Sequence, residues 1–174
     1  MTKEDIASKK NNVEHRDYIP SQIANFFLAK PVHDIDNLKL NKLVYIAYGW
    51  CLVYKIKLFE ETIQAWKFGP VIPSLYHEFK VFGFRVINRL SYFKDPLENE
   101  EIYLNIEEDD KDVLEILEQV HIKYNKKFSA VDLVRLTHKA GTPWHKTYKK
   151  GAFNLRIKDD DIIEYFNGLR NGTK

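Results

Sequence analysis

Six histidines are the side chains of this chain best suited to metal binding or acid–base chemistry, and they are spread along its length: His15, His33, His77, His121, His138 and His145. No two of them have a spacing that suggests a shared metal ion. His77 and Glu78 begin the zinc-protease pattern His-Glu-x-x-His, but Val81 stands where the second histidine belongs. The sequence therefore predicts no metal site.

The other candidates for chemistry have simpler structural roles. Cys51 falls on the apolar side of a predicted helix, where a cysteine behaves as a small inert hydrophobe. No serine lies in a G-x-S-x-G turn, and no glycine-rich loop could hold a phosphate. The carboxylates at 109–110 and 159–161 precede predicted helices, where they complement the helix dipole. We therefore expect neither a cofactor nor a catalytic residue. The alternative is an unrecognised hydrolase or transferase site around His77, Glu78 and His145.

Composition narrows the class of protein further. The 174 residues carry 27 basic and 25 acidic side chains, for a net charge of +2, and the basic ones are distributed among acids. A nucleic-acid-binding protein usually concentrates its basic residues, so nucleic acid is not a favoured partner. The N-terminal residues MTKEDIASKK lack the apolar core of a signal peptide, and no apolar run approaches the roughly 20 residues of a membrane span. A single cysteine fits a reducing compartment. We expect a cytoplasmic protein with no membrane association.

The pattern of apolar residues predicts a mainly α fold: a single compact multi-helix domain with a central buried helix and a small β element. Residues 1–17 are polar and are predicted to form a flexible segment before a domain over 18–170. The helix over 37–55 is apolar nearly all round, which indicates the central position. Other helices are predicted over 21–30, 73–83, 110–123, 129–141 and 143–148, and from 159–161 onward. Strands are predicted over 62–68, 84–93 and 102–106.

One segment, WKFGPVIPSLYHEFK at 66–80, combines a Gly-Pro turn with five aromatic residues, if His77 is counted. Two interpretations are compatible with it. In the first, Gly69 and Pro70 form a tight connection while Trp66, Phe68 and Tyr76 fill the core. In the second, the turn presents aromatic side chains to another protein, because interfaces favour Tyr and Trp as anchors. A second segment, GTPWHKTY at 141–148, predicts a capped helix start with a buried Trp144.

Four segments in the same order resemble the Panacea (SocA-like) antitoxin family. They are KLNKLVYIAYGWCLVYKIKLFEE at 39–61, WKFGPVIPSLYHEFK, GTPWHKTY, and NLRIKDDDIIEYF at 154–166. The resemblance extends over about 18–169. Residues 98–110 match nothing in the family pattern and are predicted to be a variable insertion.

The resemblance implies a protein of a toxin–antitoxin system, as in phages and mobile elements, that binds a cognate, neighbour-encoded toxin. It also implies a second partner, an AAA+ protease to which the toxin is delivered. The alternatives are a phage-associated enzyme and a DNA-binding regulator. Carried over onto the matching motifs, the predicted partner-binding residues are Lys67, Phe68, Gly69, Pro70, Val71, Tyr76, His77, His145 and Lys146.

Overall fold

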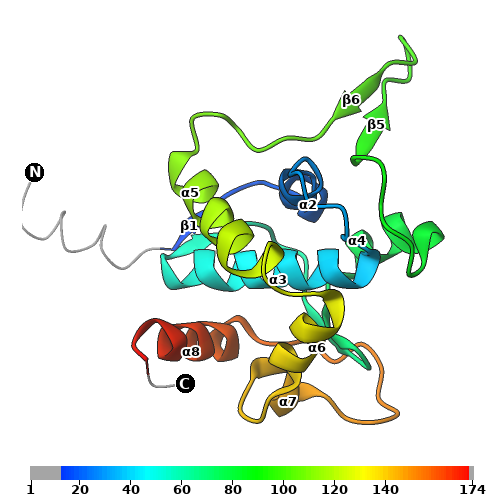
Figure 1. Cartoon of the computed structure of the whole chain (residues 1–174). Coiled ribbons are helices and arrows are strands. Elements are labelled where there is room, and N and C mark those ends of the chain that lie inside the picture. The colour runs from blue at the N-terminus through cyan, green and yellow to red at the C-terminus, as the bar shows by residue number, and fades with distance from the viewer. Residues whose placement is uncertain (1–12, 173–174) are drawn as a thin grey trace, which may run out of the picture.

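Helix α3 (Asn37–Val53) runs through the middle of the protein, with the other helices packed around it (Figure 1). The structure is a computed structural model that describes residues 13–172. Nearly every residue of α3 is buried, as the all-round apolar pattern predicted. Asp36 caps the helix, since its carboxylate accepts a hydrogen bond of 2.7 Å from the backbone N–H of Lys39.

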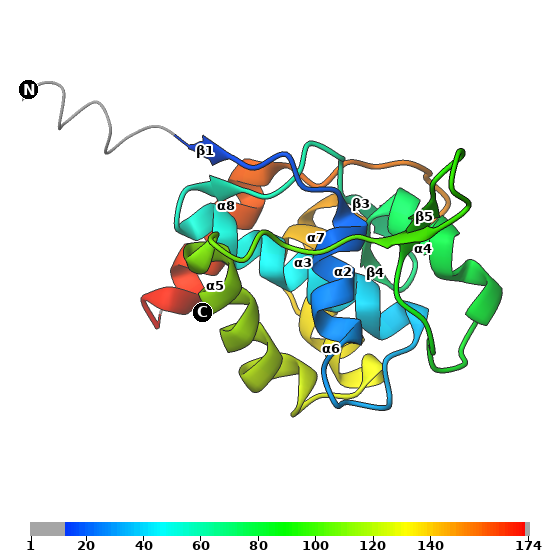
Figure 2. The same cartoon turned by 90° about the horizontal axis from the view of Figure 1, so that it is seen from above.

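Two groups of helices cover α3 on opposite sides (Figures 1 and 2). Helices α2 (Pro20–Leu28) and α5 (Lys111–Val120) lie on one side, and a π-helical turn, His121–Asn125, continues α5. Helices α6 (Ala130–His138), α7 (Pro143–Thr147) and α8 (Asp159–Arg170) lie on the other. Helix α4 (Pro73–Phe79) also contacts α3 and continues into a 3-10 turn, Lys80–Phe82. The predicted mainly α fold is confirmed.

Three short β-pairs complete the fold. Strand β1 (Glu14–His15) pairs in parallel with β2 (Ile56–Lys57). Strands β3 (Gln64–Trp66) and β4 (Gly69–Val71) form an antiparallel hairpin, of which only β3 lies within the strand predicted over 62–68. Strands β5 (Tyr92–Lys94) and β6 (Glu101–Tyr103) form a second hairpin. Residues 92–103, called the arm below, project away from the body of the protein (Figure 1).

Two predicted helix starts are confirmed, and in each the capping hydroxyl accepts a hydrogen bond from a backbone N–H in the first turn of the helix. The Ser129 hydroxyl accepts from the N–H of Asp132, whose carboxylate accepts in return from the N–H of Ser129. The Thr142 hydroxyl accepts from the N–H of His145, with Pro143 in the first turn.

Other predicted boundaries are wrong for physical reasons. The capping residue of α2 is Ile19 rather than Ser21, because the Gln22 side chain accepts from the Ile19 N–H at 2.9 Å. Helix α3 stops at Val53, since Lys55 adopts a positive φ of 63°, and Tyr54 is 56% exposed rather than buried. Most of the strand predicted over 84–93 is loop, and only its last two residues belong to β5.

The beginning of the described chain is joined to the body. Residues 1–12 of the predicted flexible segment lie outside the described residues. Further on, Arg16 Nε and the Tyr18 hydroxyl both donate to Asp110 at 2.9 Å. Burial, together with Asp110, raises the pKa of Tyr18 to about 12. Within residues 13–172, no helix is both long and apolar enough to cross a bilayer.

Candidate partner-binding surface

The β3–β4 hairpin carries most of the residues predicted to bind a partner, and its backbone is tightly constrained at Gly69. Trp66 pairs with Gly69, so Lys67 and Phe68 form a two-residue turn. Gly69 has a φ of +105°, a region that residues with a side chain rarely adopt. A Cβ atom added there would lie 2.5 Å from Cε of Lys42 and 2.9 Å from Oγ1 of Thr137. Only glycine fits at this position without displacing its neighbours.

A buried lysine on α3 holds the next residue of the hairpin. Lys42 has no exposed surface, and its Nζ donates to the carbonyl oxygen of Pro70 at 2.9 Å. Burial lowers the pKa of Lys42 to about 7, because the charged form loses its hydration, and the nearby carboxylate of Asp36 opposes this only in part. The strand and the central helix are therefore joined by a polar contact inside the core.

Two asparagines of α3 extend this polar contact to the start of α4. The side-chain N–H₂ group of Asn41 donates to Asn37, at 3.0 Å to its carbonyl oxygen and 2.9 Å to Oδ1. The oxygen of the Asn41 side chain accepts from the N–H of Ile72 at 3.1 Å. Asn37 in turn donates to the carbonyl oxygen of Tyr76 at 3.0 Å. The segment from Pro70 to Tyr76 is thus fixed to α3 at three points along its backbone.

Helices α6 and α7 support the other strand of the hairpin. Trp144 Nε1 donates to the carbonyl oxygen of Trp66 at 2.7 Å. The Trp144 ring stacks between His138, with centroids 3.6 Å apart, and Tyr148, at 4.6 Å. Burial and the nearby Lys42 lower the pKa of His138, whose buried Nε2 has no hydrogen-bond partner among residues 13–172. The hairpin is therefore held between α3 on one side and the α6–α7 corner on the other.

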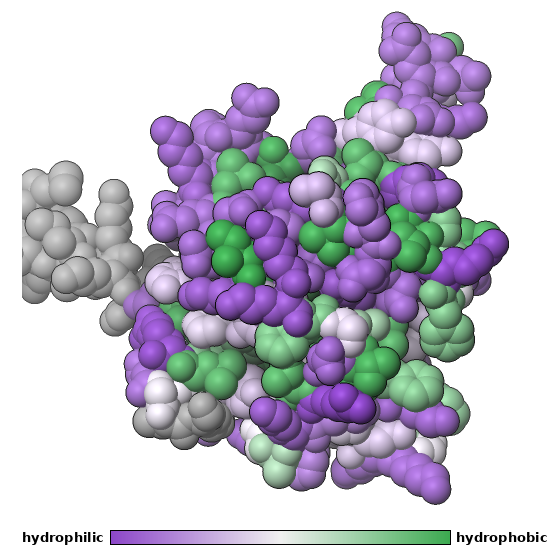
Figure 3. Space-filling view, viewed as in Figure 1, coloured by the Kyte–Doolittle hydropathy of each residue, from purple (hydrophilic) through white to green (hydrophobic). Residues whose placement is uncertain are grey.

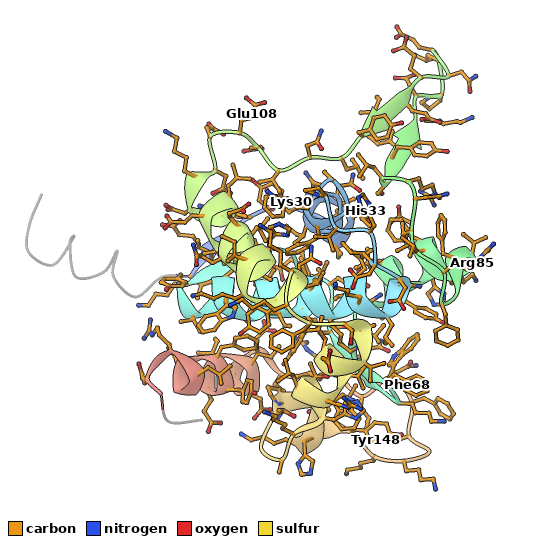
Figure 4. The ribbon with its side chains drawn as sticks, viewed as in Figure 1. Lys30, His33, Phe68, Arg85, Glu108 and Tyr148 are labelled. Atoms are coloured by element: carbon orange, nitrogen blue, oxygen red, sulfur yellow. The ribbon has the colours of Figure 1, made fainter. Side chains whose placement is uncertain are left out.

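The side chains at the end of this hairpin and on one side of α4 face solvent. Phe68 is 52% exposed and Tyr76 is 37% exposed, and Figure 4 shows Phe68 pointing away from the body. Trp66, half-buried, packs edge-on against Tyr76 with ring centroids 5.0 Å apart. Lys67 Nζ lies 5.2 Å from the Phe68 ring centroid, and His77 lies against both Tyr76 and Trp66. We call Trp66, Lys67, Phe68, Tyr76 and His77 the hairpin surface.

The structure divides the remaining predicted residues into two groups. Gly69, Pro70 and Val71 are buried, so they can only shape the backbone. His145 is exposed on α7. Lys146 is exposed but forms ion pairs with α8, at 2.8 Å to Glu164 and 3.5 Å to Asp161, and these contacts raise its pKa.

The two interpretations of residues 66–80 can now be separated by burial. The first placed Phe68 and Tyr76 in the core and is wrong for both, since their rings are exposed. The buried position predicted for Trp144 is confirmed, at 7% exposure. Partner binding by the outward-facing side chains stays a prediction.

The structure gives no support to a catalytic group of His77, Glu78 and His145. Glu78 accepts from the hydroxyl of Ser21 on α2 at 2.5 Å, whereas the His77 ring lies against Trp66 and Tyr76. The side chain of His145 forms no hydrogen bond with either residue in the described part of the chain. Cys51 is completely buried, and burial raises the pKa of its thiol, which makes it a poor nucleophile.

Sequence reasoning missed the buried polar residues of α3. Lys39 is 1% exposed, and its Nζ donates to Asp34 at 2.7 Å and to the carbonyl oxygen of Asn125 at 2.9 Å. Lys42 and Asn41 have comparable roles beside the hairpin. The sequence did contain a signal for these contacts. Lysine and asparagine side chains on a helix predicted to be buried on all sides must find hydrogen-bond partners inside the protein.

A groove between α3 and α5 provides a second exposed apolar region. It has a volume of about 420 Å³ and is lined in part by Trp50, Tyr54, Ile116 and Tyr124. None of the nine predicted partner-binding residues lines this groove.

Comparison with known protein families places this chain in a family of antitoxins, and the matched region includes the hairpin surface. The family model for the Antitoxin SocA-like, Panacea domain matches residues 40–145, a region that includes Lys42, the β3–β4 hairpin and the beginning of α7. The chain therefore belongs to the Panacea-domain family of SocA-like antitoxins. In particular, it is 36% identical over 152 residues to Antitoxin SocA of Caulobacter vibrioides (strain NA1000 / CB15N), covering 83% of this chain and 80% of that protein. No solved structure matches the chain.

Proposed function

We propose that this protein is an antitoxin that neutralises a cognate, neighbour-encoded toxin by direct contact through the hairpin surface. The observation that carries the proposal is the exposed aromatic group of Phe68 and Tyr76 on a backbone fixed from inside by Lys42, Asn41 and Trp144. Phe68 and Tyr76 both lie within residues 40–145, the region that the family model matches.

The residues of the surface have different roles in the proposal. Phe68 and Tyr76 supply apolar area for the toxin, because aromatic side chains anchor many protein interfaces. Lys67 and His77 add polar contacts at the edge of that area. Gly69, Pro70 and Val71 act only through the backbone, whose fixed geometry reduces the entropy lost on binding. His145 and Lys146 are exposed on α7, the helix whose Trp144 supports the hairpin. No catalytic step is part of this function.

Co-expression with the product of the neighbouring gene tests the proposal. We expect that product to stop growth alone and to be tolerated when this protein is present. Replacing both aromatic anchors, Phe68→Ala with Tyr76→Ala, should abolish protection and reduce binding about 100-fold, since two anchors of roughly 1–2 kcal/mol each are lost. Phe84→Ala is the matched control, because Phe84 is 85% exposed outside the surface.

Two results would show that the proposal is wrong. One is a neighbouring gene product that is harmless alone or that remains toxic in the presence of this protein. The other is full protection by a folded Phe68→Ala/Tyr76→Ala variant, which would place the binding site elsewhere.

Delivery of the toxin to an AAA+ protease is a separate part of the proposal, supported by the family resemblance. We expect the toxin to be degraded faster when this protein is present, and only in cells that contain the protease. Toxin half-lives in matched strains with and without the protease measure this effect. Equal half-lives in the two strains would remove the adaptor role and leave neutralisation by binding intact.

A further inference from the structure

The net charge of the chain is nearly balanced, but two of its regions carry net charges of opposite sign. Residues 95–112 are strongly acidic, and four of their carboxylates belong to the arm: Asp95, Glu98, Glu100 and Glu101. Residues 133–158 contain no Asp or Glu, and their basic side chains are Arg135, Lys139, Lys146, Lys149, Lys150, Arg156 and Lys158. The protein therefore has a separate acidic region and a separate basic region.

The two regions lie at opposite ends of the molecule. In Figure 4, Glu108 of the acidic region is at the top and Tyr148, next to Lys149, is near the bottom. Figure 1 shows the arm at the top and α7 with the loop that follows it at the bottom. This separation prevents a single copy from bringing its own acidic arm against its own basic region.

The arm has the features of an unpaired interaction element. Phe93 and Ile102 are directly opposite in the hairpin and are 49% and 40% exposed, while Leu97 at its tip is 94% exposed. Figure 3 shows small hydrophobic areas within the otherwise hydrophilic surface of the arm. Within the described chain, the side chains of Glu98 and Glu100 have no hydrogen-bond or ion-pair partner. An isolated two-stranded hairpin is only marginally stable in water, so a partner would stabilise it.

The basic region offers complementary groups. Lys139, Lys149 and Lys150 are exposed, and their ammonium groups form no hydrogen bond or ion pair with the rest of residues 13–172. Phe153, in the loop that carries Lys149 and Lys150, is 86% exposed and supplies an apolar group. We call residues 139 and 149–153 the basic face. Lys146 is not part of it, because its charge is already paired with α8.

We propose that two copies of this protein associate side by side in opposite directions, with the acidic arm of each copy on the basic face of the other. The complementary charges bring carboxylates such as Glu98 against ammonium groups such as Lys149, and Phe153 meets the exposed Phe93–Ile102 pair. Contacts between two arms or between two basic faces are disfavoured by like charge. Because each copy carries both surfaces at opposite ends, an antiparallel pair satisfies both at once and closes as a dimer.

Charge reversal tests this dimer on the full chain by sedimentation velocity. The wild type should dimerise at about 50 mM salt and dissociate as salt approaches about 500 mM, since screening weakens exposed charge pairs. The arm variant, Glu98→Lys with Glu100→Lys, should weaken the dimer at least tenfold, as should the face variant, Lys149→Glu with Lys150→Glu. Mixing the two variants restores complementarity, so a heterodimer should form. Lys126→Glu with Lys127→Glu, in an exposed turn outside both surfaces, is the matched control and should still dimerise.

Three results would overturn the proposal. The first is a monomeric wild type at about 100 μM in low salt, well above the micromolar affinity of ordinary weak complexes. The second is a mixture of the two folded variants that remains monomeric. The third is a monomer in which the arm variant loses only toxin binding or the face variant loses only duplex DNA binding, because the surfaces would then belong to those partners. Circular dichroism of each variant confirms folding.

Discussion

The two antiparallel hairpins of this protein have strands of equal length but very different surroundings. Each pairs two strands of three residues. The β3–β4 hairpin is held by Lys42 and Asn41 on α3 and by Trp144 on α7. The β5–β6 hairpin projects into solvent, with apolar side chains exposed near its tip. The comparison shows that a short hairpin becomes a rigid platform only through what its backbone contacts outside the hairpin.

This difference leads to different functional expectations. Rigid presentation suits Phe68 and Tyr76 as anchors for a toxin, because little order has to be gained on binding. The arm is tied to α2 at its base, where Asn25 hydrogen-bonds the backbone of Ser91 and Leu104, but its outer part projects into solvent. Its contacts with a partner are therefore expected to be weaker and more sensitive to salt.

The largest effect is expected from Gly69→Ala, because the β3–β4 hairpin packs most closely against its neighbours at Gly69. The new Cβ would meet Lys42 and Thr137, and the positive φ would add strain. We expect a loss of roughly 2–4 kcal/mol in the free energy of unfolding, measured with urea. Gly141→Ala is the control, since Gly141 also has a positive φ but open space around it, and it should cost about 1 kcal/mol. Equal losses for both variants would show that close packing at Gly69 is unimportant.

A substitution of Lys42 should change how stability depends on pH. Its folded-state pKa of about 7 lies below the ordinary lysine value of 10.5, so between these values the unfolded chain binds more protons and stability rises with pH. Lys42→Met should remove this rise, which is at most about 1.4 kcal/mol per pH unit. Urea titrations of both proteins from pH 7 to 9.5 measure the difference, in which the contributions of Cys51 and the tyrosines cancel. Parallel pH profiles would contradict a buried, readily deprotonated lysine.

A smaller loss is expected where α7 supports the hairpin. The Thr142 hydroxyl caps α7 and donates to the carbonyl oxygen of Thr137 at 2.7 Å, with Thr142 only 2% exposed. Thr142→Ala should lower the free energy of unfolding by about 1–2 kcal/mol. Thr142→Ser retains the hydroxyl and should recover most of that loss. Failure of serine to recover stability would assign the effect to the lost methyl group.

The smallest effect is expected in the arm. Leu97→Ser, at a residue that is 94% exposed, should change the free energy of unfolding by less than about 0.5 kcal/mol in high salt. A loss of more than about 1 kcal/mol would show that the arm is packed on the body, and it would remove the contrast between the two hairpins.

The features that were predictable from the sequence depend on neighbours along the chain. The apolar pattern of α3 and the capping residues Ser129 and Thr142 act within a few residues, so their outcomes were correctly predicted. The exposure of Phe68 and Tyr76 could not be derived in this way, since it depends on how α3, α6 and α7 enclose the hairpin. The role of Lys42 was hidden for the same reason, because its partner Pro70 lies far along the chain.

Hydrogen–deuterium exchange with and without the cognate toxin tests the central claim most directly. We predict that the toxin slows exchange over residues 64–80, which include the hairpin surface, and over 143–147, which form α7. Exchange in the α3–α5 groove, around Tyr54 and Ile116, should stay unchanged. Protection confined to that groove or to the arm, with residues 64–80 unaffected, would contradict the hairpin surface as the site of toxin binding.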